Sequence, residues 1–162
     1  GQIKAGPLSV GTAFHSPMME PAVPKLRELL LAADLKKPTV TVYSNVTGKD
    51  VMDGFQDGEG RGENSAEVLW FSDIMADQAQ SPVYWQESME NMIADGISTF
   101  IEIGPGNTLS GLARKINHEL VTMNIEDHET LMGTIDTLKR LIGGETAGDA
   151  AGESRPAEGK EV

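Results

Sequence analysis

The chain has 162 residues and no cysteine, and its 25 acidic against 13 basic residues give a formal net charge of −12. This length fits one ordinary domain or part of a larger one. The absence of cysteine excludes disulfides, thiolate catalysis and cysteine-ligated zinc, and it favours a reducing compartment, so we expect a cytoplasmic protein. Nucleic acid is not an expected partner, because binding phosphates requires clustered Lys and Arg. A membrane is not expected either, because no apolar run approaches the ~20 residues of a membrane span.

Two stretches differ from the rest of the chain in composition. Asp53–Ser65 and Gly143–Val162 are rich in glycine and acidic residues. The first stretch lies between apolar segments, so we predict that residues 53–65 form a long acidic surface loop. The second stretch has only Ala and Val to bury, which cannot offset the entropy lost on ordering, so we predict that residues 143–162 form a disordered acidic tail. The predicted domain therefore covers residues 1–142.

The first predicted elements alternate between strand and helix. Residues Pro7–Val10 predict a short strand, and the helical spacing of apolar side chains predicts an amphipathic helix over Met18–Asp34. Pro24 lies inside that helix and lacks a backbone donor, so we expect it to kink the helix or delay its start. The β-branched run Thr39–Tyr43 predicts a strand, and the next segment predicts a helix over Ala66–Gln78.

The second half of the chain predicts a more regular alternation. A helix that Ser81 and Pro82 are expected to cap ends near Gly96. The elements that follow are a buried strand Thr99–Ile103, a helix capped by Asn107 or Thr108, a strand Glu119–Ile125 and a helix marked by apolar residues from Leu131 to Ile142. Strands and helices that alternate with short connections predict an α/β fold with a parallel sheet and flanking helices.

Three histidines are candidates for proton transfer. His118 and His128 lie in polar settings near helix ends, where a solvated surface side chain is the simplest interpretation. His15 differs because it follows a predicted strand and precedes a helix, so it lies on a turn of the kind that positions reacting groups at the edge of a sheet. The spacing of the three histidines matches no metal-binding motif, and we predict no metal site.

A glycine-rich turn follows the strand Thr99–Ile103. Its residues Gly104, Pro105 and Gly106 open a helix, which is the geometry either of an anion site or of a tight turn that requires glycine. The turn matches neither the dinucleotide-binding fingerprint nor the P-loop. The 162 residues contain no G-x-S-x-G motif, so they predict no serine nucleophile of that type.

Four sequence blocks occur together in this chain. They are, in order, GTAFHSPMMEPAVPKL (Gly11–Leu26), TVYSNVTGKDV (Thr41–Val51), QAQSPVYWQESMENMIADG (Gln78–Gly96) and FIEIGPGNTLSGLARKI (Phe100–Ile116). Together they resemble the C-terminal half of the malonyl-CoA:acyl-carrier-protein transacylases of bacterial fatty-acid synthesis. The resemblance implies the C-terminal part of an α/β-hydrolase-like acyltransferase core with a parallel sheet. It also implies that these residues lack the serine elbow and most of the family's small ferredoxin-like subdomain.

The resemblance assigns roles to particular residues. In the family a serine attacks the malonyl thioester, a histidine activates the serine, and the phosphopantetheine thiol of the carrier resolves the malonyl-enzyme. His15 matches the catalytic histidine, and Gln78 matches the residue whose backbone carbonyl holds the imidazole. Phe14, Asn45 and the turn Gly104-Pro105-Gly106 match positions that shape the substrate pocket. The bulk of Phe14 is expected to favour malonyl over methylmalonyl groups.

The implied function is transfer of a malonyl group from malonyl-CoA to acyl carrier protein, with no cofactor bound by the enzyme itself. The implied partners are the carrier, malonyl-CoA and the missing N-terminal half of the enzyme. An acidic carrier requires basic residues on this acidic chain, for which the pair Arg114 and Lys115 is the first candidate and the pair Lys36 and Lys37 the second. An ordinary solvated surface is an equally open interpretation of each pair.

Two other functions stay open at this point. The chain could be a non-catalytic carrier-binding or regulatory module derived from the same fold, or part of the acyltransferase domain of a polyketide synthase. Since these residues lack the serine elbow, we expect the chain alone to be inactive.

Overall fold

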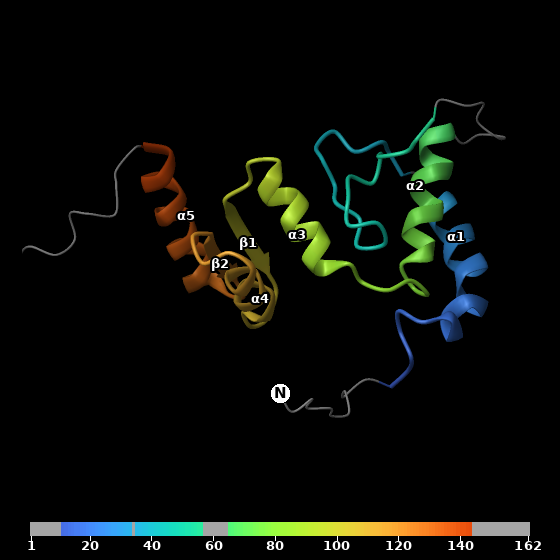
Figure 1. The fold of residues 1–162 in the computed structure, drawn as a ribbon, viewed down its shortest axis with the longest axis horizontal. Helices are drawn as coiled ribbons and strands as arrows, with labels where there is room; N and C mark the ends of the chain where they lie inside the picture. Colours follow the sequence, from blue (N-terminus) through green and yellow to red (C-terminus); the bar gives the residue numbers. More distant parts are fainter. Residues whose placement is uncertain (1–10, 34, 57–64, 144–162) are drawn as a thin grey trace, which may run out of the picture. The chain divides into compact units, whose positions relative to one another are not determined.

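The computed structural model describes residues 11–33, 35–56 and 65–143. The described residues form two compact units that divide between Ile97 and Ser98, and each unit is considered by itself. The first unit contains a 3-10 helix and three α-helices, and the second contains two strands and two helices (Figure 1). The elements are η1 (Pro17–Ala22), α1 (Val23–Leu31), α2 (Ala66–Asp77), α3 (Trp85–Ala94), β1 (Thr99–Ile103), α4 (Thr108–Ile116), β2 (Val121–Ile125) and α5 (His128–Gly143).

The first α-helix begins later than the apolar spacing predicts. The residues before Val23 form the 3-10 helix η1, and α1 begins only at Val23 and ends at Leu31. Pro24 lies in the first turn of α1, where its missing N–H removes no helical hydrogen bond. The expected delay of the helix by Pro24 is therefore confirmed.

Helix α2 confirms its predicted range to within one residue. It begins after Ser65, whose Oγ accepts a hydrogen bond from the amide of Val68 at 3.4 Å. Helices α1 and α2 lie side by side (Figure 1), and an ion pair between Arg27 and Asp73 links them. This pairing joins the segment that follows His15 to the helix that precedes Gln78.

The prediction of a strand over Thr39–Tyr43 is wrong. Tyr43 alone forms a β-bridge, antiparallel to Asp50, and the amide of Val51 donates to the carbonyl of Val42 at 2.7 Å. Val40 remains 74% exposed. β-branched residues favour strands where a neighbouring strand and a half-buried face are available. In the described part of the chain this segment pairs only with the loop that directly follows it.

Helix α3 ends near Gly96 as predicted but begins later than its predicted cap. Ser81 and Pro82 lie outside the helix, and the N-cap residue is Tyr84. The amide of Tyr84 donates to the backbone carbonyl of Asn45 at 2.9 Å, and this bond fixes the chain just before the helix. Gly96 ends the segment with a φ of +89°, a conformation that favours glycine.

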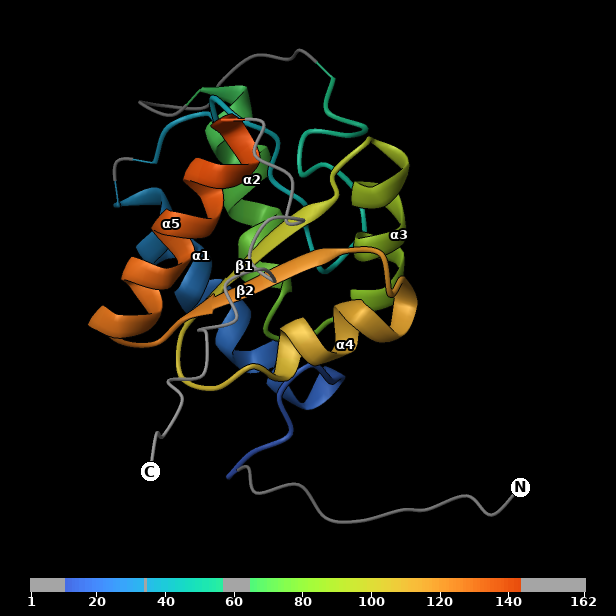
Figure 2. The ribbon, with the colours of Figure 1, turned by 90° about the vertical axis from the view of Figure 1, so that its left-hand side faces the viewer.

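The second unit is a β-α-β arrangement followed by a helix (Figure 2). Strands β1 and β2 pair in parallel, with Thr99 opposite Val121 and Ile103 opposite Ile125. Helix α4 connects the strands and contacts both, and α5 contacts β2. These elements confirm the predicted alternation and the α/β class. The expectation that β1 is buried is wrong, because Ile103 is 81% exposed in a described sheet of only two strands.

Three predictions lie wholly or mainly outside the described residues. They concern the strand at residues 7–10, most of the acidic loop at 53–65 and the tail beyond residue 143. Among the described residues, no helix combines the length and apolar character that crossing a membrane requires.

Candidate active site

His15 lies on the short turn that enters η1, in a strained backbone conformation. Its φ is +59°, and it is the one non-glycine residue with a positive φ among the described residues. Ser16 closes the turn, since its Oγ donates to the carbonyl of Ala13 at 2.7 Å. A left-handed conformation costs an L-residue roughly 1–2 kcal/mol, and such strain concentrates at functional sites.

Two consecutive carbonyls hold His15 from a segment 63 residues further along the chain. The ring Nδ1 lies 3.0 Å from the carbonyl oxygen of Gln78, and the backbone amide of His15 donates to the carbonyl of Ala79 at 3.0 Å. A carbonyl oxygen can only accept, so Nδ1 is the donor of the first bond. In the neutral ring, Nε2 is then free of hydrogen and has a lone pair that can accept a proton.

The carbonyls of Gln78 and Ala79 lie at the end of a helix. Helix α2 ends at Asp77, so the Gln78 and Ala79 carbonyls lie at its C-terminus, where no helical amide follows to bond them. The C-terminal end of a helix carries the negative end of its dipole and favours a nearby positive charge. The two carbonyls that bind His15 are therefore carbonyls of a helix end that no helical amide binds.

Phe14 and Asn45 belong to the same unit as His15. Phe14 precedes His15 directly and is 57% exposed. Asn45 is half-buried, and its backbone carbonyl binds Tyr84 at the start of α3. No hydrogen bond between Asn45 and His15 occurs within the described residues.

The Gly104-Pro105-Gly106 turn is attached to the end of β2. Gly104 and Gly106 have φ values of +145° and +79°, so the backbone at both positions favours glycine. The amide of Gly104 donates to the carbonyl of Ile125 at 3.0 Å, and the amide of Gly106 donates to Oε2 of Glu126 at 2.7 Å. The side chain of Asn124 donates to the carbonyl of Gly106 at 3.3 Å.

The start of α4 is occupied by a carboxylate of the chain itself. Glu102 on β1 accepts hydrogen bonds from the amides of Leu109 at 3.1 Å and Ser110 at 2.8 Å. The bond from the Ser110 amide is the main cause that lowers the pKa of Glu102. Asn107 is the N-cap residue by position, but its side chain makes no capping bond. Of the two interpretations left open by the sequence, the tight turn fits this arrangement, since a carboxylate of the chain already binds the amides of Leu109 and Ser110.

The predicted carrier-binding residues lie on exposed surface. Arg114 and Lys115 occupy the last turn of α4, and Nη1 of Arg114 donates to Oγ1 of Thr122 at 2.8 Å. Lys36 and Lys37 follow α1 and are also exposed. His118 and His128 are exposed as well.

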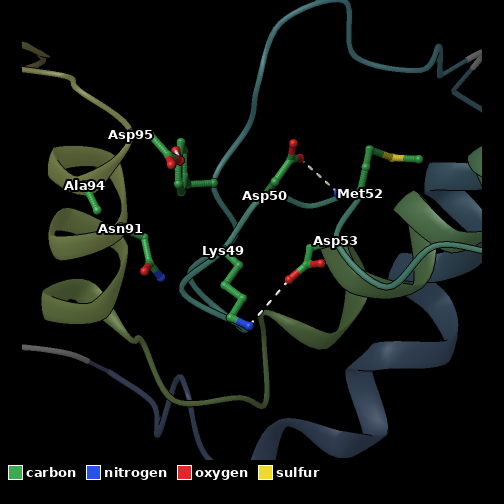
Figure 3. Close-up of a pocket in the computed structure, with 8 residues that line it drawn as sticks. Lys49, Asp50, Met52, Asp53, Asn91, Ala94 and Asp95 are labelled. Carbon is green, nitrogen blue, oxygen red and sulfur yellow. Dashed lines mark hydrogen bonds and ion pairs between the residues drawn. The ribbon is translucent and has the colours of Figure 1, made fainter.

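A hollow of about 400 Å³ lies between the loop after Tyr43 and helix α3 (Figure 3). Several of its side chains bind one another, since Lys49 lies 3.5 Å from Asp53 and the Tyr43 hydroxyl donates to Asp95. The bond to Asp95 raises the pKa of Tyr43 to about 12. The sequence predicts none of these residues as functional. The lining residues are Tyr43, Lys49, Asp50, Met52, Asp53, Asn91, Ala94 and Asp95.

The structure therefore brings His15 and Gln78 together, as the resemblance predicts for a catalytic histidine and its carbonyl. Phe14 and Asn45 share their unit, while the glycine turn, Arg114 and Lys115 belong to the second unit. The sequence analysis did not predict the positive φ at His15, although histidine is, with Asn and Asp, one of the non-glycine residues enriched at such positions. Nor did it mark Ala79, which holds the backbone of His15.

No family model matches the chain. Comparisons with curated sequences and with solved structures find the same kind of protein. The malonyl CoA-acyl carrier protein transacylase of Bacillus subtilis is 42% identical over 139 residues, which cover 86% of this chain and 39% of that protein. The solved transacylase of Clostridium perfringens is 32% identical, with a TM-score of 0.66 over 86% of this chain and 40% of that one.

A third similarity is to a solved complex of a type II polyketide-synthase acyl carrier protein with its malonyl-transacylase. That structure is 29% identical and has a TM-score of 0.64, covering 81% of this chain and 38% of that one. The chain thus spans about two fifths of the length of the relatives it matches. In sequence and in fold it belongs to the malonyl-CoA:acyl-carrier-protein transacylase family, and it corresponds to the C-terminal portion of these proteins.

Proposed function

We propose that this chain supplies the general base for malonyl transfer from malonyl-CoA to an acyl carrier protein. The observation that carries the proposal is the contact between Nδ1 of His15 and the Gln78 carbonyl, which leaves Nε2 free to accept a proton. The names of the relatives support the substrate and the carrier. The nucleophile is a serine hydroxyl contributed by residues outside these 162, as the family resemblance implies.

In the first half-reaction, Nε2 of His15 takes the proton from the serine hydroxyl as the serine oxygen bonds to the thioester carbon of malonyl-CoA. The carbon–sulfur bond then breaks, and the imidazolium returns the proton to the departing sulfur of CoA. The Gln78 carbonyl keeps the ring in the correct tautomer and stabilises the imidazolium, which is the role of the third group in a catalytic triad.

In the second half-reaction, the thiol of the carrier's phosphopantetheine gives its proton to Nε2. The carrier sulfur bonds to the malonyl carbon, and the serine oxygen leaves with the proton from His15. In this proposal Phe14 and Asn45 of the first unit shape the malonyl pocket, and no cofactor takes part. Arg114 and Lys115 attract the acidic carrier, because their exposed positive charges offset the acidic character of the chain.

A second candidate function is transfer to the carrier of a polyketide pathway. The similarity to the transacylase solved with a type II polyketide-synthase carrier favours this second candidate, which uses the same residues and the same chemistry. Comparing carriers from fatty-acid and polyketide systems as acceptors separates the two.

The experiment that tests the proposal joins this chain to the preceding part of the Bacillus subtilis relative in one polypeptide. We expect the joined enzyme to transfer malonyl groups and the 162-residue chain alone to transfer none. His15→Ala should lower transfer by the joined enzyme about a hundredfold or more, and His118→Ala serves as the matched control. Transfer by the chain alone, or full activity of the joined His15→Ala enzyme, would contradict the proposal.

A further inference from the structure

We propose that the side-chain hydrogen bond between Gln80 and Asp77 positions His15 by fixing the two carbonyls that hold it. The catalytic meaning of this inference rests on the proposed function, whereas its structural content is testable without turnover. Gln80 and Asp77 are positioning residues, since they act through the backbone of the residues between them.

The two carbonyls lie on a short turn that Asp77 closes. Gln78 and Ala79 are the two residues between Asp77 and Gln80, and Nε2 of Gln80 donates to Oδ1 of Asp77 at 3.0 Å. The backbone carbonyl of Asp77 also accepts from the amide of Gln80 at 3.2 Å and from that of Ser81 at 3.0 Å. Both Asp77 and Gln80 are half-buried, so solvent competes less with their bond than on an open surface.

The hold on His15 requires both carbonyls at once. The Ala79 carbonyl binds the backbone amide of His15, and the Gln78 carbonyl binds the ring. The backbone bond fixes the strained residue, and the ring bond sets the tautomer. If the turn opened, either carbonyl could rotate toward water, and the ring would lose the acceptor that keeps hydrogen on Nδ1. The Gln80–Asp77 bond opposes that opening.

Three variants separate this bond from general effects on the turn. Gln80→Glu removes the donor and places a second carboxylate against Asp77. In the double variant Asp77→Asn/Gln80→Glu, the new amide can donate to the new carboxylate, so the bond forms again with the roles exchanged. Gln86→Glu is the matched control, because Gln86 makes the same kind of bond to Glu90 at 2.7 Å elsewhere in the unit.

The readout is the tautomer of the His15 ring, measured by ¹⁵N NMR in the 162-residue chain at about pH 8.5, roughly two pH units above the pKa of a model-peptide imidazole. His118 and His128 serve as internal references, and exchange of the His15 amide reports on its bond to Ala79. We expect mainly the Nδ1–H tautomer in the parent and in Gln86→Glu. Gln80→Glu should shift the tautomer ratio toward Nε2–H by about two- to tenfold, the range for one lost hydrogen bond, and should speed amide exchange.

The double variant should restore the parent ratio. An unchanged ratio and unchanged exchange in Gln80→Glu would overturn the inference, as would a double variant that behaves like Gln80→Glu. If Gln80→Glu disturbs the whole fold, Gln80→Ala gives the same comparison without the added charge. A tautomer that responds as expected, together with full activity of the joined His15→Ala enzyme, would keep the positioning role and overturn the proposed function.

Discussion

Several turns in the described residues adopt backbone conformations that favour glycine, and two of them differ in the residue that occupies the position. At the Gly104-Pro105-Gly106 turn, both residues with positive φ are glycines, so residue type and backbone agree. At the entry to η1, the residue with positive φ is His15. Strain of this kind is frequent at functional sites, and here the bonds of His15 to Gln78 and Ala79 hold the strained residue in place.

The two turns also differ in the groups that hold them. Carboxylates hold the glycine turn and the helix after it, through Glu126 at Gly106 and Glu102 at the start of α4. Neutral backbone carbonyls hold His15. The start of α4 should therefore respond to acid through Glu102, whereas the backbone carbonyls that bind His15 have no titratable proton.

The largest effect on stability is expected at the glycine turn. Gly104→Ala should lower the free energy of unfolding by about 1–3 kcal/mol, since its φ of +145° strains any residue with a Cβ. The space around the new methyl is open, so the cost comes from the backbone alone. Urea unfolding measures it, with Gly133→Ala in the middle of α5 as the control that should be neutral or slightly stabilising. If the parent and Gly104→Ala were equally stable, the backbone at position 104 would not require glycine, and the turn would not differ from the His15 turn in this respect.

A second prediction separates proton transfer by His15 from docking of the carrier on helix α4. Arg114→Glu/Lys115→Glu in the joined enzyme should raise the carrier KM about threefold or more at low salt, because it repels an acidic carrier. Added salt should weaken this effect, and loading from malonyl-CoA should not change. The reversal Lys139→Glu/Arg140→Glu on α5 is the matched control. Equal carrier kinetics for both reversals would refute the docking role of α4.

A third prediction tests the strain at His15 directly. His15→Gly should be more stable than His15→Ala by several tenths of a kcal/mol, up to about 1 kcal/mol. Glycine adopts positive φ without the Cβ clash, and this gain exceeds its greater loss of chain entropy. Thermal unfolding of the two variants measures the difference. If His15→Ala proves the more stable, the turn does not store the strain we infer.

The smallest effect concerns pH at the start of α4. Hydrogen bonds from Ser110 and Leu109 lower the pKa of Glu102 in the folded chain. Its contribution to stability is therefore complete above the unfolded pKa, near ~4.3, and is lost as the pH falls through the lower folded pKa. Glu102→Gln should lower the melting temperature by a few degrees near neutral pH and by less in acid. Glu119→Gln on the exposed surface should show no such convergence with the parent.

The elements of the second unit could be predicted from the sequence because each depends on local signals. Apolar spacing, the β-branched run before Gly104 and the glycines themselves mark β1, α4, β2 and α5. The run Thr39–Tyr43 has an equally strong strand pattern. A strand also requires a neighbouring strand to pair with, and the residues of the segment alone do not show whether one is present. The same holds for Ile103, whose exposure depends on what lies beside the sheet.

Only part of the candidate site could be predicted from the sequence. The contact between His15 and Gln78 joins segments 63 residues apart, and no periodicity or spacing predicts it, so it followed from the family resemblance alone. The choice between an anion site and a tight turn could not be made from the sequence, because it depends on Glu102 of the preceding strand, which binds amides at the start of α4. The bond between the His15 amide and the Ala79 carbonyl also joins distant segments, so no local pattern predicts it.

The most direct test of the account measures malonyl transfer by the joined His15→Gly enzyme with and without added imidazole. Glycine suits the backbone of this turn and leaves room for a free ring where the histidine ring was. We predict transfer about a hundredfold or more below the parent, which imidazole raises in proportion to its concentration because it supplies the missing base. Transfer at the parent rate without imidazole would contradict the claim that the ring of His15 is the base.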